Sequence, residues 1–195
     1  MLRYQTDAYA ATLTVDVLSC EARVSEPGAD PGREHGVELR LSDSLFYPEG
    51  GGQPGDHGSI AGQPLRGLRV ADDGELYHWV DRPLSGPVEL RLDWARRYDF
   101  MQQHSAEHLL AATGAELGLG IIAFHLGDHM CDLEFDAARI DGQRLAQLEA
   151  LVNERIREQR AIDIRSIDAS HLDELGVRYR RLREGAGGQI RLVEI

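Results

Sequence analysis

Residues 93–117 read DWARRYDFMQQHSAEHLLAATGAEL, and at this stretch the pattern of the chain changes from strand-like to helical. Asp93 is a residue type that caps helix N-termini, and Gly118 and Gly120 are residue types that end helices. The sequence therefore predicts a helix from Trp94 to Leu117. Six residues are expected to form its apolar side: Trp94, Tyr98, Met101, Leu109, Ala112 and Leu117.

Before this helix, the chain is predicted to form short strands separated by turns rich in Gly, Pro and Asp. Alternating or apolar runs place strands at residues 12–18, 37–41, 59–60, 68–71, 76–80 and 88–92. Strands of this length and spacing are typical of a small barrel or sandwich. Residues 1–93 are therefore expected to form an N-terminal β-domain.

The second half of the chain mixes both periods. A second helix is predicted over residues 141–160, with Leu145, Leu148, Leu151, Val152 and Ile156 as its apolar stripe. Strands are predicted at residues 130–136, 162–167, 177–182 and 190–195. The fold class predicted for the whole chain is α+β, with a second domain over residues 94–195. A chain of 195 residues is long enough for two small domains.

Composition restricts the function classes. Acidic residues number 33 and basic residues 21, all of them arginine, which gives a net charge of −12. This charge argues against non-specific nucleic-acid binding, so DNA is not an expected partner. No apolar run approaches the ~20 residues of a membrane span, and the first residues do not resemble a signal peptide. Two cysteines, Cys20 and Cys131, make no disulfide framework, which favours the reducing cytoplasm.

Two histidines within the first helix are the strongest chemical signal. His104 and His108 are four residues apart, so both imidazoles lie on one helix face and can reach one cation. Packing or surface histidines at this spacing are the alternative. Glu107 also completes the His-x-x-Glu-His pattern of inverted zincins, where the carboxylate is a general base and Glu184 could be a third ligand. A solvated helix carboxylate is the interpretation that we favour for Glu107.

Two other candidate ligand groups are weaker. His125 and His129 have the same spacing, but Gly127 and Asp128 between them favour a turn, so we expect loop histidines near the site. Cys131 belongs to an alternating apolar strand and is expected to be a small buried residue rather than a ligand.

Residues 46–56, FYPEGGGQPGD, form a glycine-rich motif. Successive glycines can adopt positive φ and approach another chain or a ligand closely, and Gln53 can both donate and accept hydrogen bonds there. No helix and no Gly-Lys-Ser/Thr follow, which argues against a phosphate-binding loop. The alternative is a long turn within a barrel, and the number of glycines taken alone favours this alternative.

Four arginines, Arg178, Arg180, Arg181 and Arg183, lie within the predicted strand at residues 177–182 and just after it. Arginine suits bidentate contact with phosphate, so this strand is a candidate for contact with a polyanion. The alternative is a solvated edge strand whose charges block aggregation.

Taken together, these motifs resemble a known family. The combination is the glycine-rich motif, then the Asp93-Trp94-Ala95-Arg96-Arg97-Tyr98 segment, then His104-x-x-x-His108-Leu-Leu, with residues 124–127 and 190–195 also similar. It resembles the freestanding alanyl-tRNA editing proteins and the matching editing domain of alanyl-tRNA synthetase. The resemblance extends from about residue 45 to residue 195.

The resemblance implies an N-terminal small β-barrel joined to an α+β editing domain with an antiparallel sheet and long helices. It also implies Zn²⁺ on His104 and His108, and zinc-assisted hydrolysis of tRNA(Ala) mischarged with serine or glycine. On this basis Gly51, Gly52 and Gln53 are expected to bind substrate. The four arginines at positions 178, 180, 181 and 183 are expected to bind the phosphates of the tRNA acceptor stem.

One departure from the family pattern concerns the metal site. In the family, the strand matching residues 190–195 leads to a Cys-x-x-x-His segment that completes the site, and this sequence has no such segment. Either the missing ligands follow Ile195 in a longer protein, or zinc is held weakly by fewer ligands. Ser105 also stands where threonine is frequent. Two other functions stay open: a non-catalytic tRNA-binding module, which the missing segment favours, and a zinc peptidase of the inverted type, which the His-x-x-Glu-His pattern suggests.

Overall fold

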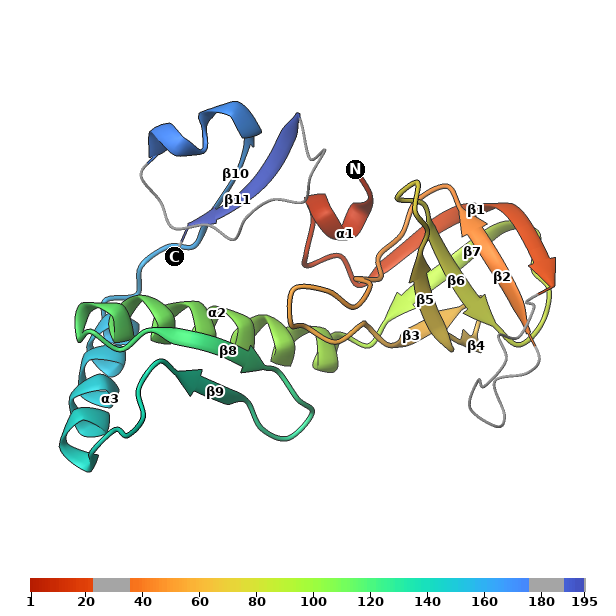
Figure 1. Cartoon of the computed structure of the whole chain (residues 1–195). Helices are drawn as coiled ribbons and strands as arrows, with labels where there is room; N and C mark the ends of the chain where they lie inside the picture. Colours follow the sequence, from red (N-terminus) through yellow and green to blue (C-terminus); the bar gives the residue numbers. More distant parts are fainter. Residues whose placement is uncertain (23–35, 176–187, 195) are drawn as a thin grey trace. The chain divides into compact units, whose positions relative to one another are not determined.

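The computed structural model describes residues 1–22, 36–175 and 188–194, and the fold of this part is mixed α+β (Figure 1). The chain divides into two compact units. The first contains Met1–Glu107 and Ile121–Phe135, and the second contains His108–Gly120 and Asp136–Ile195. None of the described helices is long and apolar enough to cross a membrane.

The first unit contains a seven-stranded antiparallel sheet in the order β4-β3-β7-β1-β2-β6-β5. The strands are β1 (Thr12–Ala22), β2 (Val37–Leu41), β3 (Gly58–Ile60), β4 (Gln63–Pro64), β5 (Gly67–Val70), β6 (Leu76–Val80) and β7 (Gly86–Leu92). The sheet curls into a half-barrel, and a one-turn helix, α1 (Arg3–Thr6), precedes it (Figure 1). All six strands predicted here are confirmed to within a few residues, and β4 is an additional strand.

Alternation along the strands builds the core of this sheet. In β7, Val88, Leu90 and Leu92 are buried while the residues between them are exposed, which is the period-2 pattern of a strand with one buried face. Leu39 of β2 and Phe46, which follows that strand, are fully buried in the same cluster. The sheet therefore buries one face, and the chain between β2 and β3 carries the glycine-rich motif.

The long helix α2 (Trp94–Glu116) matches its predicted bounds to within one residue. The carboxylate of Asp93 accepts a hydrogen bond from the backbone N–H of Arg96 at 3.2 Å, as expected of an N-cap. After the helix, Gly118 adopts φ +71°, the left-handed conformation that glycine tolerates best.

The predicted apolar side of α2 is wrong at two of its six positions, whereas Trp94 packs against the core of the sheet and the other three residues are half-buried. Tyr98 is 43% exposed and Ala112 is exposed, whereas Arg97, Phe100 and Glu107 are buried. Charged residues can occupy the buried side only where partners compensate for lost hydration. For Arg97 those partners come from the glycine-rich motif and from the N-terminal segment.

The remaining described elements are two hairpins and three helices. Strands β8 (Ile121–His125) and β9 (Asp132–Phe135) form one hairpin, and β10 (Asp163–Asp168) and β11 (Gln189–Glu194) form another. The described strands of this half thus form two separate two-stranded sheets. Between the hairpins lies α3 (Gly142–Arg157), and after β10 come the short helices η1 (Ala169–His171) and η2 (Asp173–Leu175).

Helix α3 is capped by Asp141, whose carboxylate accepts a hydrogen bond from the Arg144 N–H at 2.8 Å. Of its predicted apolar stripe, Leu148 is buried, whereas Leu145 and Ile156 are 47% and 57% exposed. The helical period is therefore confirmed, but only the middle of the stripe is covered.

Candidate metal centre and glycine-rich turn

Helix α2 brings three potential metal ligands together. One ligand atom from each of His104, Glu107 and His108 lies within 4.8 Å of the other two. The helix dictates this grouping, because residues i, i+3 and i+4 lie one above another on the same face. His104 is half-buried and His108 is exposed. Glu107 is only 6% exposed, so the interpretation of this side chain as a solvated carboxylate is wrong.

This donor set fits a divalent metal such as zinc. Two imidazole nitrogens and one carboxylate oxygen are ligand types that zinc accepts, and catalytic zinc sites commonly have three protein ligands. The negative charge of a buried carboxylate would also compensate for part of the charge of a divalent cation. Among the described residues, these three form the group able to hold a metal ion.

The glycine-rich motif forms a tight two-residue turn. Gly50 and Gln53 exchange backbone hydrogen bonds of 3.1 and 3.0 Å, and the two residues between them have positive φ, 59° at Gly51 and 85° at Gly52. Positive φ at both central positions is the signature of a type I′ turn, which glycine adopts without steric cost. The turn therefore needs the glycines that the sequence supplies.

Gly52 is also required because of what lies against it. A Cβ atom on this residue would lie 2.9 Å from Cε2 of Phe124, a distance that real Cβ atoms do not show. Phe124 belongs to β8, and its ring centroid lies 5.9 Å from that of His104. At Gly52 the glycine backbone thus lies against an aromatic side chain of the same chain, beside the candidate metal group.

Gln53 connects the turn to the helix. Its side-chain Oε1 lies 2.9 Å from Nδ1 of His104, and the residue is only 7% exposed. The glutamine predicted to contact substrate therefore contacts one of the two predicted metal ligands. This contact joins residues 51 positions apart in the sequence.

A buried ion pair holds the glycine-rich motif onto the start of α2. Arg97 is hydrogen-bonded to both carboxylate oxygens of Asp56, and the same carboxylate accepts the backbone N–H of Tyr47 at 2.6 Å. Arg97 also donates to the carbonyl oxygens of Leu45 at 2.7 Å and Ala8 at 3.0 Å. Both ends of the motif are thereby attached to one helical residue.

Arg96 makes a second attachment. It donates to the carbonyl oxygen of Gly55 at 3.3 Å, pairs with Asp128 in the β8–β9 connection, and lies over the ring of Phe100 at 4.6 Å. The hydrogen bond from Arg96 lowers the pKa of the Asp128 carboxyl, and the charge of Arg96 acts in the same direction. Two adjacent arginines thus connect α2 to the motif and to the β8–β9 hairpin.

Gln103, one residue before the first histidine, also contacts this hairpin. Its amide donates to the carbonyl of Gly127 at 3.2 Å and to Asp99 at 2.7 Å, and its Oε1 accepts from the thiol of Cys131 at 2.8 Å. Cys131 is half-buried rather than buried, and burial is the main cause that raises its pKa. Cys131 was predicted to lie within a strand, but β9 begins at Asp132, so Cys131 lies just before it.

Other predicted site residues lie elsewhere. His125 ends β8 and His129 follows it in a bend, and both are exposed, which confirms that this second pair does not lie on a helix. The four arginines Arg178, Arg180, Arg181 and Arg183 fall outside the described residues, as does Glu184.

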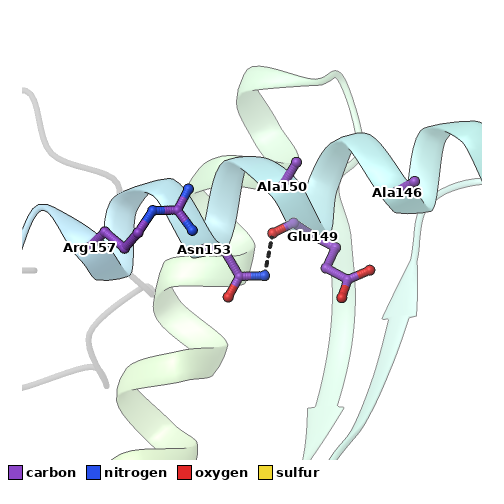
Figure 2. Close-up of a pocket in the computed structure, with 5 residues that line it drawn as sticks. All are labelled: Ala146, Glu149, Ala150, Asn153 and Arg157. Atoms are coloured by element: carbon purple, nitrogen blue, oxygen red, sulfur yellow. Dashed lines mark hydrogen bonds between the residues drawn. The ribbon is translucent and has the colours of Figure 1, made fainter.

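A hollow of about 350 Å³ lies along α3, and its lining residues include none of the candidate metal ligands and none of the glycine-rich motif. Figure 2 shows its lining, Ala146, Glu149, Ala150, Asn153 and Arg157, all on one side of the helix. Asn153 donates to the backbone carbonyl of Glu149 at 2.9 Å. This lining provides no nucleophile and no metal ligand set, so we place the candidate site on α2.

Asp56, Arg97, Phe124 and the burial of Glu107 were not foreseen from the sequence. Asp56 stands at the end of the glycine-rich motif, and Arg97 lies on the first turn of α2. Aspartate and arginine do not by themselves predict burial, because charged side chains are normally exposed.

The chain is similar to known proteins along most of its length, although no family model matches it. It is 36% identical over 198 residues to alanyl-tRNA editing protein Aarsd1 of Rattus norvegicus, covering 98% of this chain and 48% of the relative. It is 31% identical to AlaX-L of Pyrococcus horikoshii, covering 82% and 41%. It is 28% identical to AlaX-M of Methanosarcina mazei, covering 91% and 78%.

Fold and site together define a mixed α+β protein with a candidate metal group on a long helix and a glycine turn docked against it. Its homologues across most of the chain are alanyl-tRNA editing proteins. The chain spans about half the length of the Aarsd1 relatives that it matches.

Proposed function

We propose that this chain is the editing part of a trans-editing deacylase that hydrolyses tRNA(Ala) mischarged with serine, and also with glycine. The observation that carries the proposal is the group of His104, Glu107 and His108, with ligand atoms within 4.8 Å of one another, on a helix contacted by Gln53. Similarity to alanyl-tRNA editing proteins along 98% of the chain supports the substrate class.

In this proposal, His104 and His108 hold Zn²⁺ through imidazole nitrogens, and Glu107 supplies a third donor. When bound, zinc would supply Lewis-acid chemistry, by polarising the ester carbonyl, activating water or holding the substrate amine. The reaction is ester hydrolysis: the oxygen of water bonds to the carbonyl carbon, and the bond from that carbon to the ribose oxygen breaks. The ribose oxygen takes up a proton, which leaves free amino acid and uncharged tRNA.

The chain's own residues orient the substrate. Gly51 has no side chain, which allows a ligand to approach the backbone of the turn there, while the missing side chain at Gly52 lets the turn pack against Phe124. Phe124 packs over Gly52 and lies near His104, so it supplies an apolar wall that excludes water from one side. Gln53 contributes from the turn to the same site.

The tRNA and the domain organisation complete the proposal. Arg178, Arg180, Arg181 and Arg183 contact phosphates of the acceptor stem, where bidentate guanidinium contacts suit a polyanion. Residues 1–93 form a barrel domain that carries the glycine-rich motif, and residues 94–195 form the editing domain. The curled seven-stranded sheet supports the barrel assignment.

The test compares deacylation with metal content. Purified chain is assayed on Ser-tRNA(Ala), Gly-tRNA(Ala) and Ala-tRNA(Ala), and bound zinc is measured in the same samples. We expect hydrolysis of the first two substrates, and loss of both zinc and hydrolysis in His104→Ala and His108→Ala. His129→Ala is the matched control, because His129 is exposed and outside the group, and it should keep both properties. Variants of His104 and His108 that hold as much zinc as the unmodified chain would refute the ligand assignment.

A second function has one observation in its favour. Glu107 is buried beside the two histidines, and His-x-x-Glu-His is the inverted zincin pattern, in which this carboxylate is the general base. A zinc peptidase predicts that Glu107→Gln abolishes peptide cleavage and that tRNA has no effect. A non-catalytic tRNA-binding module instead predicts binding of Ser-tRNA(Ala) without turnover. The deacylation assay, together with an assay of casein cleavage by the same samples, distinguishes the deacylase, the peptidase and the binding module.

A further inference from the structure

The contact between Gln53 and His104 determines which nitrogen of the imidazole can bind a metal. The amide oxygen Oε1 of Gln53 lies 2.9 Å from Nδ1 of His104. An amide oxygen can only accept a hydrogen bond, so Nδ1 must be the donor and must carry the proton. In the neutral imidazole, the lone pair then resides on Nε2. This contact therefore presents Nε2 of His104 as the ligand atom.

The amide that makes this contact is itself held firmly. Gln53 is 7% exposed, and its backbone is fixed by the pair of hydrogen bonds with Gly50. The turn between them packs under Phe124 so closely that no side chain fits at Gly52. A buried side chain on a fixed turn has few alternative rotamers, so the amide can hold the imidazole at one orientation.

We propose that Gln53 is a positioning residue that fixes the Nδ1–H tautomer and the ring orientation of His104, so that Nε2 is ready to bind metal. This role deepens, and rests on, the function proposed above. Metal-ligating histidines generally donate their other N–H to such a partner, and loss of the partner typically weakens metal binding by about 10–100-fold. Here the partner comes from the glycine-rich motif, which assigns that motif a task at the metal site besides shaping the pocket.

The first test needs no metal. Long-range ¹H–¹⁵N NMR spectra of the metal-free, ¹⁵N-histidine-labelled chain distinguish the two neutral tautomers by their nitrogen shifts. His104→Ala identifies the resonances. We expect the Nδ1–H tautomer at His104 in the unmodified chain and a mixture of tautomers in Gln53→Met. An Nε2–H tautomer in the unmodified chain would overturn the proposal.

The second test measures zinc affinity by competition with a chromophoric chelator. Gln53→Met, of similar size but without an acceptor oxygen, should bind zinc about 10–100-fold more weakly. Gln53→Glu keeps an acceptor oxygen at the same position and should restore both the affinity and the Nδ1–H tautomer. Rescue by the conservative variant separates positioning from a general effect on folding.

Gln63 provides the matched control. It is as buried as Gln53, at 6% exposed, and its amide bonds the backbone of Arg82 with distances of 3.1 and 2.9 Å. Gln63→Met removes a buried glutamine from the same unit without touching His104. It should leave zinc affinity and the His104 tautomer unchanged. An equal loss of affinity in Gln63→Met and Gln53→Met would show a merely structural effect and overturn the proposal.

The outcomes also separate this positioning role from the proposed function. A chain that binds zinc in a Gln53-dependent manner but does not hydrolyse Ser-tRNA(Ala) would refute the deacylase and support the positioning role. A chain that hydrolyses Ser-tRNA(Ala) equally well with Gln53→Met, at unchanged zinc affinity and tautomer, would refute the positioning role and keep the deacylase.

Discussion

Replacing Asp56 by asparagine should strongly destabilise the first unit, because it leaves the charge of Arg97 buried without a counter-charge. The side chains of Arg97 and Asp56 are 4% and 1% exposed, respectively. Arg97 Nε lies 3.0 and 3.1 Å from the two carboxylate oxygens, and Nη2 also contacts one of them. Asparagine has nearly the same shape, so the substitution removes the charge and leaves the packing almost unchanged.

The magnitude follows from the burial of the pair. Removing one partner of a buried ion pair typically costs about 3–5 kcal/mol. Arg97 keeps its hydrogen bonds to the carbonyls of Leu45 and Ala8, so we expect the lower end, ~3 kcal/mol. A domain of this kind has only about 5–15 kcal/mol of stability in total, so this loss is a large part of it. With a urea m-value of about 2 kcal/mol/M, the unfolding midpoint should fall by roughly 1.5 M.

The assay is urea unfolding followed by circular dichroism, with Asp81→Asn as the control. Asp81 pairs with Arg66 through two hydrogen bonds of 3.0 and 2.9 Å, but both side chains are nearly half exposed. Exposed pairs contribute little, so Asp81→Asn should leave the midpoint unchanged. Equal midpoints for Asp56→Asn and Asp81→Asn would refute the reasoning. The double variant Asp56→Leu, Arg97→Met should recover part of the loss, because it removes both charges.

A buried histidine, a strained alanine and the arginine-rich segment can each be tested by substitution. Burial lowers the pKa of His78 to about 4 from 6.5, so the folded state loses stability as pH falls below 6.5. Between pH 7.5 and pH 4.5, the free energy of unfolding should fall by about 2.5 kcal/mol more in the unmodified chain than in His78→Gln. Ala61 has φ +48°, so Ala61→Gly should raise the free energy of unfolding by about 0.5–1 kcal/mol in the same urea assay; a decrease would contradict the strain argument. Arg180→Glu and Arg181→Glu should each lower the magnitude of the slope of log tRNA affinity against log salt concentration by about 0.7–0.9, whereas the control Arg66→Glu should leave the slope unchanged. An unchanged slope in all three variants would show that the tRNA does not contact Arg180 or Arg181.

Local features of this protein could be predicted from neighbouring residues. The bounds of α2 follow from Asp93 and Gly118, because capping and left-handed φ are properties of single residues. The grouping of His104 with His108 follows from helix geometry, which places residues four apart on one face. The strands of the curled sheet follow from period-2 alternation, which depends only on adjacent positions.

The buried side of α2 could not be predicted from the same pattern. Hydrophobic periodicity assumes that charged residues face water, and that assumption fails at Arg97 and Glu107. The burial of Arg97 depends on partners far along the chain, such as Asp56, which is 41 residues away. Only the folded chain brings such a counter-charge close enough to compensate for lost hydration.

The surroundings of the glycine-rich motif likewise depend on long-range packing. The sequence indicated a turn with positive φ and a glutamine able to form hydrogen bonds, and both are present. It did not indicate that Gln53 would meet His104 or that Gly52 would lie under Phe124. Turn conformation is a local property of two glycines, whereas the partner of a side chain 51 residues away is set by how the strands and the helix pack against each other.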